Sequence, residues 1–90
     1  MSIEVEFFGI PRARAGTHRA AVLNGRSSAQ LSEVFAALRL EFPDFAAACL
    51  CHNSLRDGYV ASVDGEFFTL GDTLVDSGKS VLILSADAGG

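Results

Sequence analysis

The 90-residue sequence contains no tryptophan, only two cysteines and only two prolines. Two cysteines are too few for the disulfide framework of a small secreted domain. No apolar run approaches the roughly 18 residues that a membrane-spanning helix needs, and Met1–Ile10 lacks the basic start and apolar stretch of a secretory signal. These absences predict a soluble, cytoplasmic protein that does not act at a membrane.

Basic residues are also scarce, with 7 Lys and Arg against 11 Asp and Glu and a formal net charge of −4. Nucleic-acid binding draws most of its affinity from Lys and Arg side chains that neutralise phosphates. The local basic cluster of Arg12, Arg14, His18 and Arg19 lacks the interleaved aromatic residues that stack on bases. We expect no nucleic-acid partner, and we interpret the cluster as a solvated end of a hairpin.

The two cysteines lie close together in the segment Cys49-Leu50-Cys51-His52. A structural zinc site needs four ligands, usually in two separated pairs, and the nearest other candidate ligand, His18, is far upstream. A disulfide across one intervening residue would be strained. The segment therefore predicts no metal site, and we interpret Cys49 and Cys51 as small apolar residues at the end of a helical stretch.

The first half of the chain has clear periodicities. Ile3–Phe7 alternates apolar and acidic residues, which predicts a half-buried strand that Phe8 extends. Gly9-Ile10-Pro11 interrupts it, and Thr17–Leu23 predicts a second strand that completes a hairpin. A helix is predicted over Ser28–Phe42, capped by Ser27 or Ser28 and ended by Pro43. Its apolar stripe consists of Leu31, Val34, Phe35 and Leu38.

The second half alternates short strands with turns. Phe45–Leu50 predicts a short helical segment, and Asn53–Gly58 predicts a polar loop. The next strand, Tyr59–Val63, is followed by the turn pair Asp64-Gly65 and a short return strand over Glu66–Thr69. Turn residues continue to Lys79. The apolar run Val81–Leu84 predicts a strand buried on both faces near the sheet centre.

The order of elements predicts an α+β, β-grasp (ubiquitin-like) fold: a mixed sheet of about five strands with one main helix across one face. In this arrangement the first and last strands lie parallel at the centre of the sheet. We expect residues 1–84 to form the domain. Residues 85–90 carry no burial signal, and we expect them to form a flexible tail that ends in two glycines.

Two features bear on function. His18 and His52 have no carboxylate nearby in sequence at triad-like spacing, and no phosphate-binding glycine loop is present, so we expect the chain not to be an enzyme. Gly89 and Gly90 occupy the last two positions. Because glycine makes up about 7% of residues, such a pair ends a chain by chance about once in 200.

The sequence resembles the ThiS/MoaD-type sulfur carriers, the prokaryotic ubiquitin-like family that includes the small subunit of molybdopterin synthase. The resemblance covers the whole chain and rests on Val5–Gly9, Leu38–Pro43, Val60–Glu66, Thr73–Val81 and Leu82–Gly90. Only the terminal Gly-Gly is mechanistically specific. The prolines that often precede the terminal segment in molybdopterin-synthase small subunits are replaced here by Ser85-Ala86-Asp87-Ala88, which leaves the receiving pathway open.

The resemblance implies that the carboxylate of Gly90 is the working group and that Gly89 gives the backbone clearance. An E1-like adenylating enzyme would activate this carboxylate with ATP, and a sulfur donor would convert it to a thiocarboxylate. A synthase subunit similar to the molybdopterin synthase large subunit would then accept the sulfur. The chain itself would bind no cofactor.

Five further residues are candidates for partner binding. The three aromatic ones, Phe8, Phe67 and Phe68, exceed what one helix can cover, so we expect some of them on the sheet face away from the helix. The alternative is that they fill a second small core around Phe42 and Phe45. The tail contributes Asp87 and Ala88. Two other functions stay open: a ubiquitin-like modifier joined to lysines through Gly90, and a β-grasp interaction module in which Gly-Gly is incidental.

Overall fold

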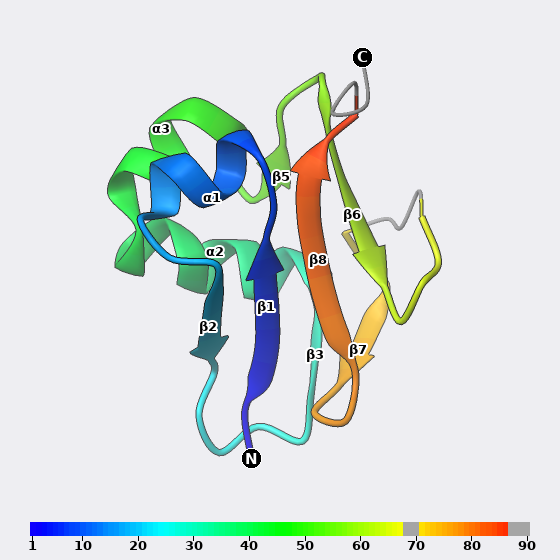
Figure 1. The fold of residues 1–90 in the computed structure, drawn as a ribbon. Coiled ribbons are helices and arrows are strands. Elements are labelled where there is room, and N and C mark those ends of the chain that lie inside the picture. The colour runs from blue at the N-terminus through cyan, green and yellow to red at the C-terminus, as the bar shows by residue number, and fades with distance from the viewer. Residues whose placement is uncertain (68–70, 87–90) are drawn as a thin grey trace.

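A mixed sheet of four strands forms the centre of the computed structural model, which describes residues 1–67 and 71–86 (Figure 1). The strands β1 (Ile3–Phe7), β2 (Arg19–Val22), β6 (Tyr59–Val63) and β8 (Ser80–Ser85) lie in the order β2-β1-β8-β6. β1 and β8 are parallel at the centre, with Val5 opposite Val81, whereas β2 and β6 flank them antiparallel. The predicted central pairing of the first and last strands is confirmed.

Two short strand pairs complete the sheet structure. β3 (Ser28–Gln30) pairs with β7 (Leu74–Asp76), and β4 (Leu50–Cys51) pairs with β5 (Ser54–Leu55). The main sheet has four strands instead of about five, because the predicted return strand over 66–69 does not join it: Glu66 forms an isolated bridge with Val63, Phe67 lies in no strand, and residues 68–69 lie outside the described residues. None of β3, β4, β5 and β7 was predicted, since each has only two or three residues and no apolar alternation.

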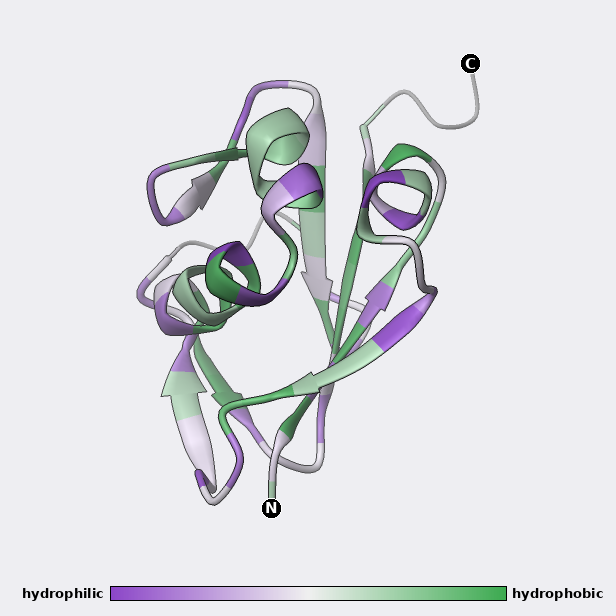
Figure 2. Cartoon of the chain, turned by 90° about the vertical axis from the view of Figure 1, so that its left-hand side faces the viewer, coloured by the Kyte–Doolittle hydropathy of each residue, from purple (hydrophilic) through white to green (hydrophobic). Residues whose placement is uncertain are grey.

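The main helix, α2 (Leu31–Glu41), packs its predicted apolar stripe into the core. Leu31, Val34, Phe35 and Leu38 are each at most 3% exposed. In Figure 2, which is turned 90° from Figure 1, α2 lies on one side of the sheet. α2 begins three residues later than predicted because Ser28–Gln30 pairs with β7. The predicted cap at Ser27 or Ser28 is therefore wrong, and Gln30 occupies the N-cap position.

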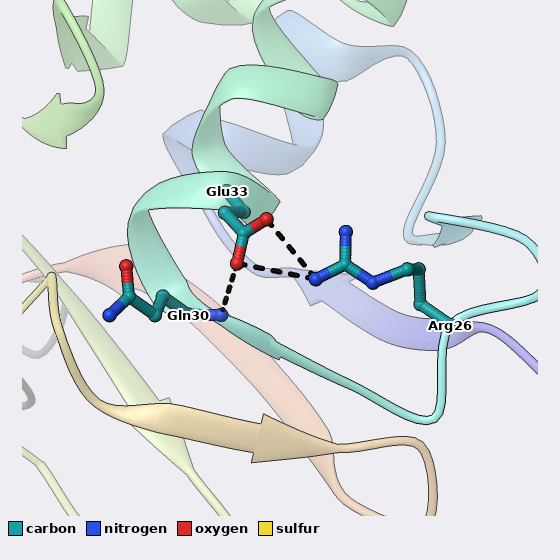
Figure 3. Close-up of polar contacts among 3 residues, drawn as sticks. All are labelled: Arg26, Gln30 and Glu33. Atoms are coloured by element: carbon teal, nitrogen blue, oxygen red, sulfur yellow. Dashed lines mark hydrogen bonds and ion pairs between the residues drawn. The ribbon is translucent and has the colours of Figure 1, made fainter.

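The start of α2 is held by one carboxylate. Glu33 accepts a hydrogen bond of 2.9 Å from the backbone N–H of Gln30 and lies 3.2 Å from the guanidinium of Arg26 (Figure 3). The Gln30 N–H first, and then Arg26, lower the pKa of Glu33 below its ordinary value, because both favour the charged carboxylate. This contact ties the helix to the loop that precedes β3.

Two shorter helices lie near the end of the sheet to which β1 and β8 point (Figure 1). The predicted segment at Phe45–Leu50 is confirmed as α3 (Pro43–Cys49). Phe7 contacts Phe42 and Phe45 edge-on, with ring centroids 5.5 and 5.1 Å apart. Phe7 and Phe45 belong to the single hydrophobic core of the described residues, with Phe42 packed against it, and Phe8 and Phe67, which are about half exposed, fill no second core there.

The segment after β1 differs from the prediction. We expected a hairpin connection, but Ile10–Ala15 forms the helix α1, with Pro11 buried in its first turn. Proline is favoured at that position because its missing N–H would have no partner there. The helix ends at Gly16, whose φ of 77° is a left-handed conformation that glycine adopts readily. Arg12 and Arg14 are thus helical residues rather than part of a hairpin end.

Strand β8 is buried on one face only. Val81, Ile83 and Ser85 are buried, whereas Leu82 and Leu84 are partly exposed. The prediction of burial on both faces is wrong, because Leu82 and Leu84, which alternate with the buried residues, keep part of their surface exposed. None of the helices in residues 1–67 and 71–86 has the length and apolar character needed to cross a bilayer.

Candidate functional site

The last strand of the sheet continues one residue closer to the C-terminus than predicted. Ser85, expected in the tail, is the last residue of β8, pairs with Tyr59 and is 6% exposed. The backbone N–H of Ala86 then donates a 2.7 Å hydrogen bond to the carbonyl of Gly58. The four predicted site residues that follow, Asp87, Ala88, Gly89 and Gly90, lie outside the described residues.

An apolar row crosses the open face of the sheet next to this end. The backbone N–H of Phe8 donates to the carbonyl of Ile83 at 3.0 Å, so Phe8 continues the parallel ladder beside Leu84. Leu84 lies opposite Val60 on β6. Side chains alternate between faces, and Phe7 and Ile83 point into the core, so Phe8 and Leu84 belong to the other face. We call Phe8, Leu84 and Val60 the apolar row.

The exposure of the apolar row fits a surface that another molecule can cover. Phe8 is 56% exposed, and Leu84 and Val60 are partly exposed. The sequence suggested Phe8 for this face but missed Leu84, because the continuous run Val81–Leu84 concealed the alternation. The sequence of β1 did indicate which face is open, because its acidic residues Glu4 and Glu6 lie there. The residues of β8 that pair with Glu4 and Glu6 lie on the same face.

The other aromatic candidates do not join the apolar row. Phe67 is 49% exposed and follows Glu66, whose backbone bonds to Val63 on β6. This segment is attached to the edge strand β6, and β8 lies between β6 and β1. Val63 pairs near the start of β8, whereas Phe8 lies beside the end of β8. Phe68 lies outside the described residues. The structure therefore places Phe8 and Phe67 in different regions, and their part in partner binding stays a prediction.

The cysteine segment is divided between the interior and the surface. Cys49 is fully buried at the end of α3, and burial raises the pKa of its thiol despite a hydrogen bond with Tyr59 and the nearby charges of Arg14 and Arg56. Cys51 and His52 are exposed, and both thiols are free. Within the part of the chain that the structure describes, no three His, Cys, Asp or Glu side chains are grouped to hold a metal ion.

The comparisons with known proteins come from structure. No protein-family model matches the sequence, and no curated protein matches it significantly. Small archaeal modifier protein 1 (SAMP1) from Haloferax volcanii superposes with a TM-score of 0.81 at 21% identity, covering 100% of both chains. The fold is that of the ubiquitin-like β-grasp proteins.

Two other solved structures are similar. A putative molybdopterin converting factor, subunit 1, from Pyrococcus furiosus gives a TM-score of 0.72 at 13% identity, over 94% of this chain and 97% of that one. Urm1 from Sulfolobus solfataricus gives 0.64 at 17% identity, over 91% and 97%. At these identities the likeness shows the shared β-grasp fold, so function has to be argued from the chain itself.

Proposed function

We propose that this chain is a sulfur carrier whose Gly90 carboxylate is adenylated by an E1-like enzyme and converted to a thiocarboxylate. The proposal rests on a β-grasp fold that is similar to SAMP1 over 100% of the chain and to a putative molybdopterin converting factor subunit over 94%. In this fold the central strand β8 precedes Gly89-Gly90 by a few residues. The thiocarboxylate then donates its sulfur to a synthase subunit in cofactor or metabolite biosynthesis.

The chemistry proceeds in two steps, the first at an oxygen of the Gly90 carboxylate and the second at its carbonyl carbon. The Gly90 carboxylate attacks the α-phosphate of ATP on the partner enzyme, and pyrophosphate leaves. A sulfide-level sulfur nucleophile then attacks the acyl carbon, and AMP leaves with one carboxylate oxygen. Glycine suits both steps because a residue without a side chain lets other groups approach closely and adopts conformations that other residues avoid. In this proposal the chain is a substrate, and ATP belongs to the partner.

The apolar row supplies a docking surface for the adenylating enzyme. Phe8 and Leu84 lie at the end of β8 from which the chain continues toward Gly90. A partner that holds the terminus must cover the surface around this end. Burying an exposed aromatic and two aliphatic side chains there offsets part of the entropy lost when the last residues are ordered.

The mass of the intact protein purified from its native cells tests the proposal. A carrier is expected as two species, one with a Gly90 carboxylate and one heavier by the difference between sulfur and oxygen. A chain that extends beyond Gly90, or one that is never thiolated by an adenylating enzyme with ATP and a sulfur donor, would contradict it.

A ubiquitin-like protein modifier is the second candidate, and it is favoured by the structural similarity to small archaeal modifier protein 1. The modifier would use the same activated Gly90 carboxylate but transfer it to a lysine amine. Conjugates of higher mass in a lysate, each with an isopeptide bond to Gly90, would support this function. If deletion of Gly90 has no effect in the cell, the chain is an interaction module instead.

A further inference from the structure

Three basic side chains lie on α1 or just after it, beside the end of β1. Arg12 and Arg14 on α1 and His18 just after it are all exposed, and we call these three residues the basic corner. No Asp or Glu lies between Glu6 and Glu33 in the sequence, although the whole chain has a net charge of −4. Arg19 pairs with Glu6 at 2.9 Å. Within residues 1–67 and 71–86, no member of the basic corner forms an ion pair.

A hollow of about 540 Å³ lies at the basic corner. Its lining consists of Gly9, Arg12, Ala13, Gly16, Thr17 and His18. Gly9 and Gly16 flank α1 at its two ends, and Ala13 lies within it, so the hollow runs along one side of this short helix. A Cβ atom added at Gly9 or Gly16 would meet no heavy atom within 4 Å. A ligand group can thus approach the α1 backbone while Arg12 and His18 offer N–H donors to it.

The helix that carries Arg12 and Arg14 lies at the end of the sheet from which the chain leaves β8. α1 contacts β8 and lies at the end toward which β1 and β8 both point (Figure 1). Arg56 comes from the turn that contains Gly58, the partner of Ala86. Arg14 and Arg56 both lie close enough to Cys49 to act on its thiol electrostatically. Arg14 and Arg56 thus come from two separate segments and both lie near Cys49 at the end of α3.

We propose that the basic corner docks an acidic segment of a partner protein, with a carboxylate of that segment entering the hollow between α1 and His18. The Arg12 guanidinium can donate two parallel hydrogen bonds to one carboxylate, a geometry that favours Asp and Glu side chains. This deepens the proposed function, since a partner that processes the C-terminus must approach the same end of the sheet. The recognition itself needs no sulfur chemistry.

The charge distribution favours a protein segment over a nucleic acid. A nucleic acid carries a long, dense row of phosphates and would extend past the basic corner. The rest of this acidic protein, including Glu4 on the open sheet face, would repel those phosphates. Attraction between exposed charges is largely screened beyond about 8 Å at physiological salt. A patch of three side chains therefore matches a short acidic segment.

Titration of ¹⁵N-labelled protein with a polyglutamate peptide at low salt tests the proposal. We expect amide shifts confined to residues 9–19 and to the Arg56 turn. The double variant Arg12→Glu, Arg14→Glu is expected to weaken binding at least about tenfold, because it removes the Arg12 donor at the hollow, removes a second positive charge from α1 and adds repulsion. The matched control, Arg39→Glu with Lys79→Glu, makes the same change in net charge at exposed sites outside the basic corner and should bind like the original protein.

Several outcomes would overturn the proposal. They are the absence of shifts, shifts centred elsewhere, or equal weakening in the control. Inorganic phosphate that binds as tightly as the peptide would indicate a free-anion site, and an oligothymidine that binds more tightly would indicate a nucleic-acid surface. If the double variant loses its fold by circular dichroism, Arg12→Gln with Arg14→Gln replaces it. The titration contains neither enzyme nor sulfur donor, so it can fail or succeed independently of the thiolation test.

Discussion

At the scale of single residues, Phe8 and Phe7 show how adjacent aromatic side chains take different roles. Phe7 is 2% exposed and packs against Phe42 and Phe45, whereas Phe8 is 56% exposed on the other face of the sheet. The alternation of a strand separates them. A large exposed aromatic at the end of an otherwise well-packed strand contributes little to folding, which leaves it available for binding.

Replacing Phe8 with Ser tests this division. We expect Phe8→Ser to weaken binding to the adenylating enzyme at least about tenfold, as loss of a central aromatic anchor does in other interfaces, while the midpoint of thermal unfolding changes little. Leu40→Ser is the control, because Leu40 is 86% exposed and lies at the end of α2, away from the apolar row. Affinity by calorimetry that is equal in both variants would remove the apolar row from the docking surface.

The interior of α2 gives a prediction about stability. Phe35 is 3% exposed in the face of α2 that packs against the sheet. Phe35→Ala should lower the free energy of unfolding by roughly 3–5 kcal/mol, because it removes buried surface and leaves a cavity. Leu40→Ala on the same helix should change it by less than about 0.5 kcal/mol, as an exposed site does. Denaturant unfolding measures both, and similar losses would mean that α2 packs differently.

At the scale of the element, the start of α2 should make stability depend on pH. The folded-state pKa of Glu33 is lowered, first by the Gln30 N–H and then by Arg26, so its contribution is present above the unfolded-state pKa. It is lost as the pH falls through the folded-state pKa. Glu33→Gln should therefore be less stable than the original protein near neutral pH and approach it in acid. Arg26→Gln should show a smaller difference, because it leaves the Gln30 hydrogen bond in place.

Thermal unfolding across the acid range provides the measurement. The comparison is between the two variants and the original protein at each pH, so that general acid destabilisation cancels. A stability difference for Glu33→Gln that stays constant into strong acid would show that the carboxylate charge does not stabilise the start of α2.

At the scale of the whole molecule, the sequence predicted the elements with strong periodicity and missed the short ones. Ile3–Phe7, the stripe of α2 and Tyr59–Val63 each repeat a pattern over several residues, and the parallel central pair follows from their order. α1 was missed because Gly9 and Pro11 suggest a turn, although proline also fits the first turn of a helix. β3 and β7 depend on each other across more than forty residues, so neither is visible alone.

The candidate site was accessible to sequence reasoning only in part. Phe8 could be assigned because its neighbours alternate, whereas Leu84 could not, since a run of four apolar residues carries no alternation. The hollow at the basic corner is lined by residues of α1 and by Gly9 and Gly16 at its two ends, and α1 was not predicted. A cluster of basic residues that looked like a solvated hairpin end thus becomes a shaped surface once its backbone conformation is known.

The tail of the molecule provides the decisive prediction, because the proposed chemistry depends on one atom group at one position. Removing Gly90, or adding one residue after it, should abolish thiolation by an adenylating enzyme with ATP and a sulfur donor. Neither change should alter the midpoint of thermal unfolding, since the core residues all lie between Ile3 and Ile83. Intact mass measures the first effect and calorimetry the second. If the shortened chain still gains sulfur, for example as a persulfide on the exposed Cys51, the sulfur is carried by a cysteine and the Gly90 carboxylate is not the site.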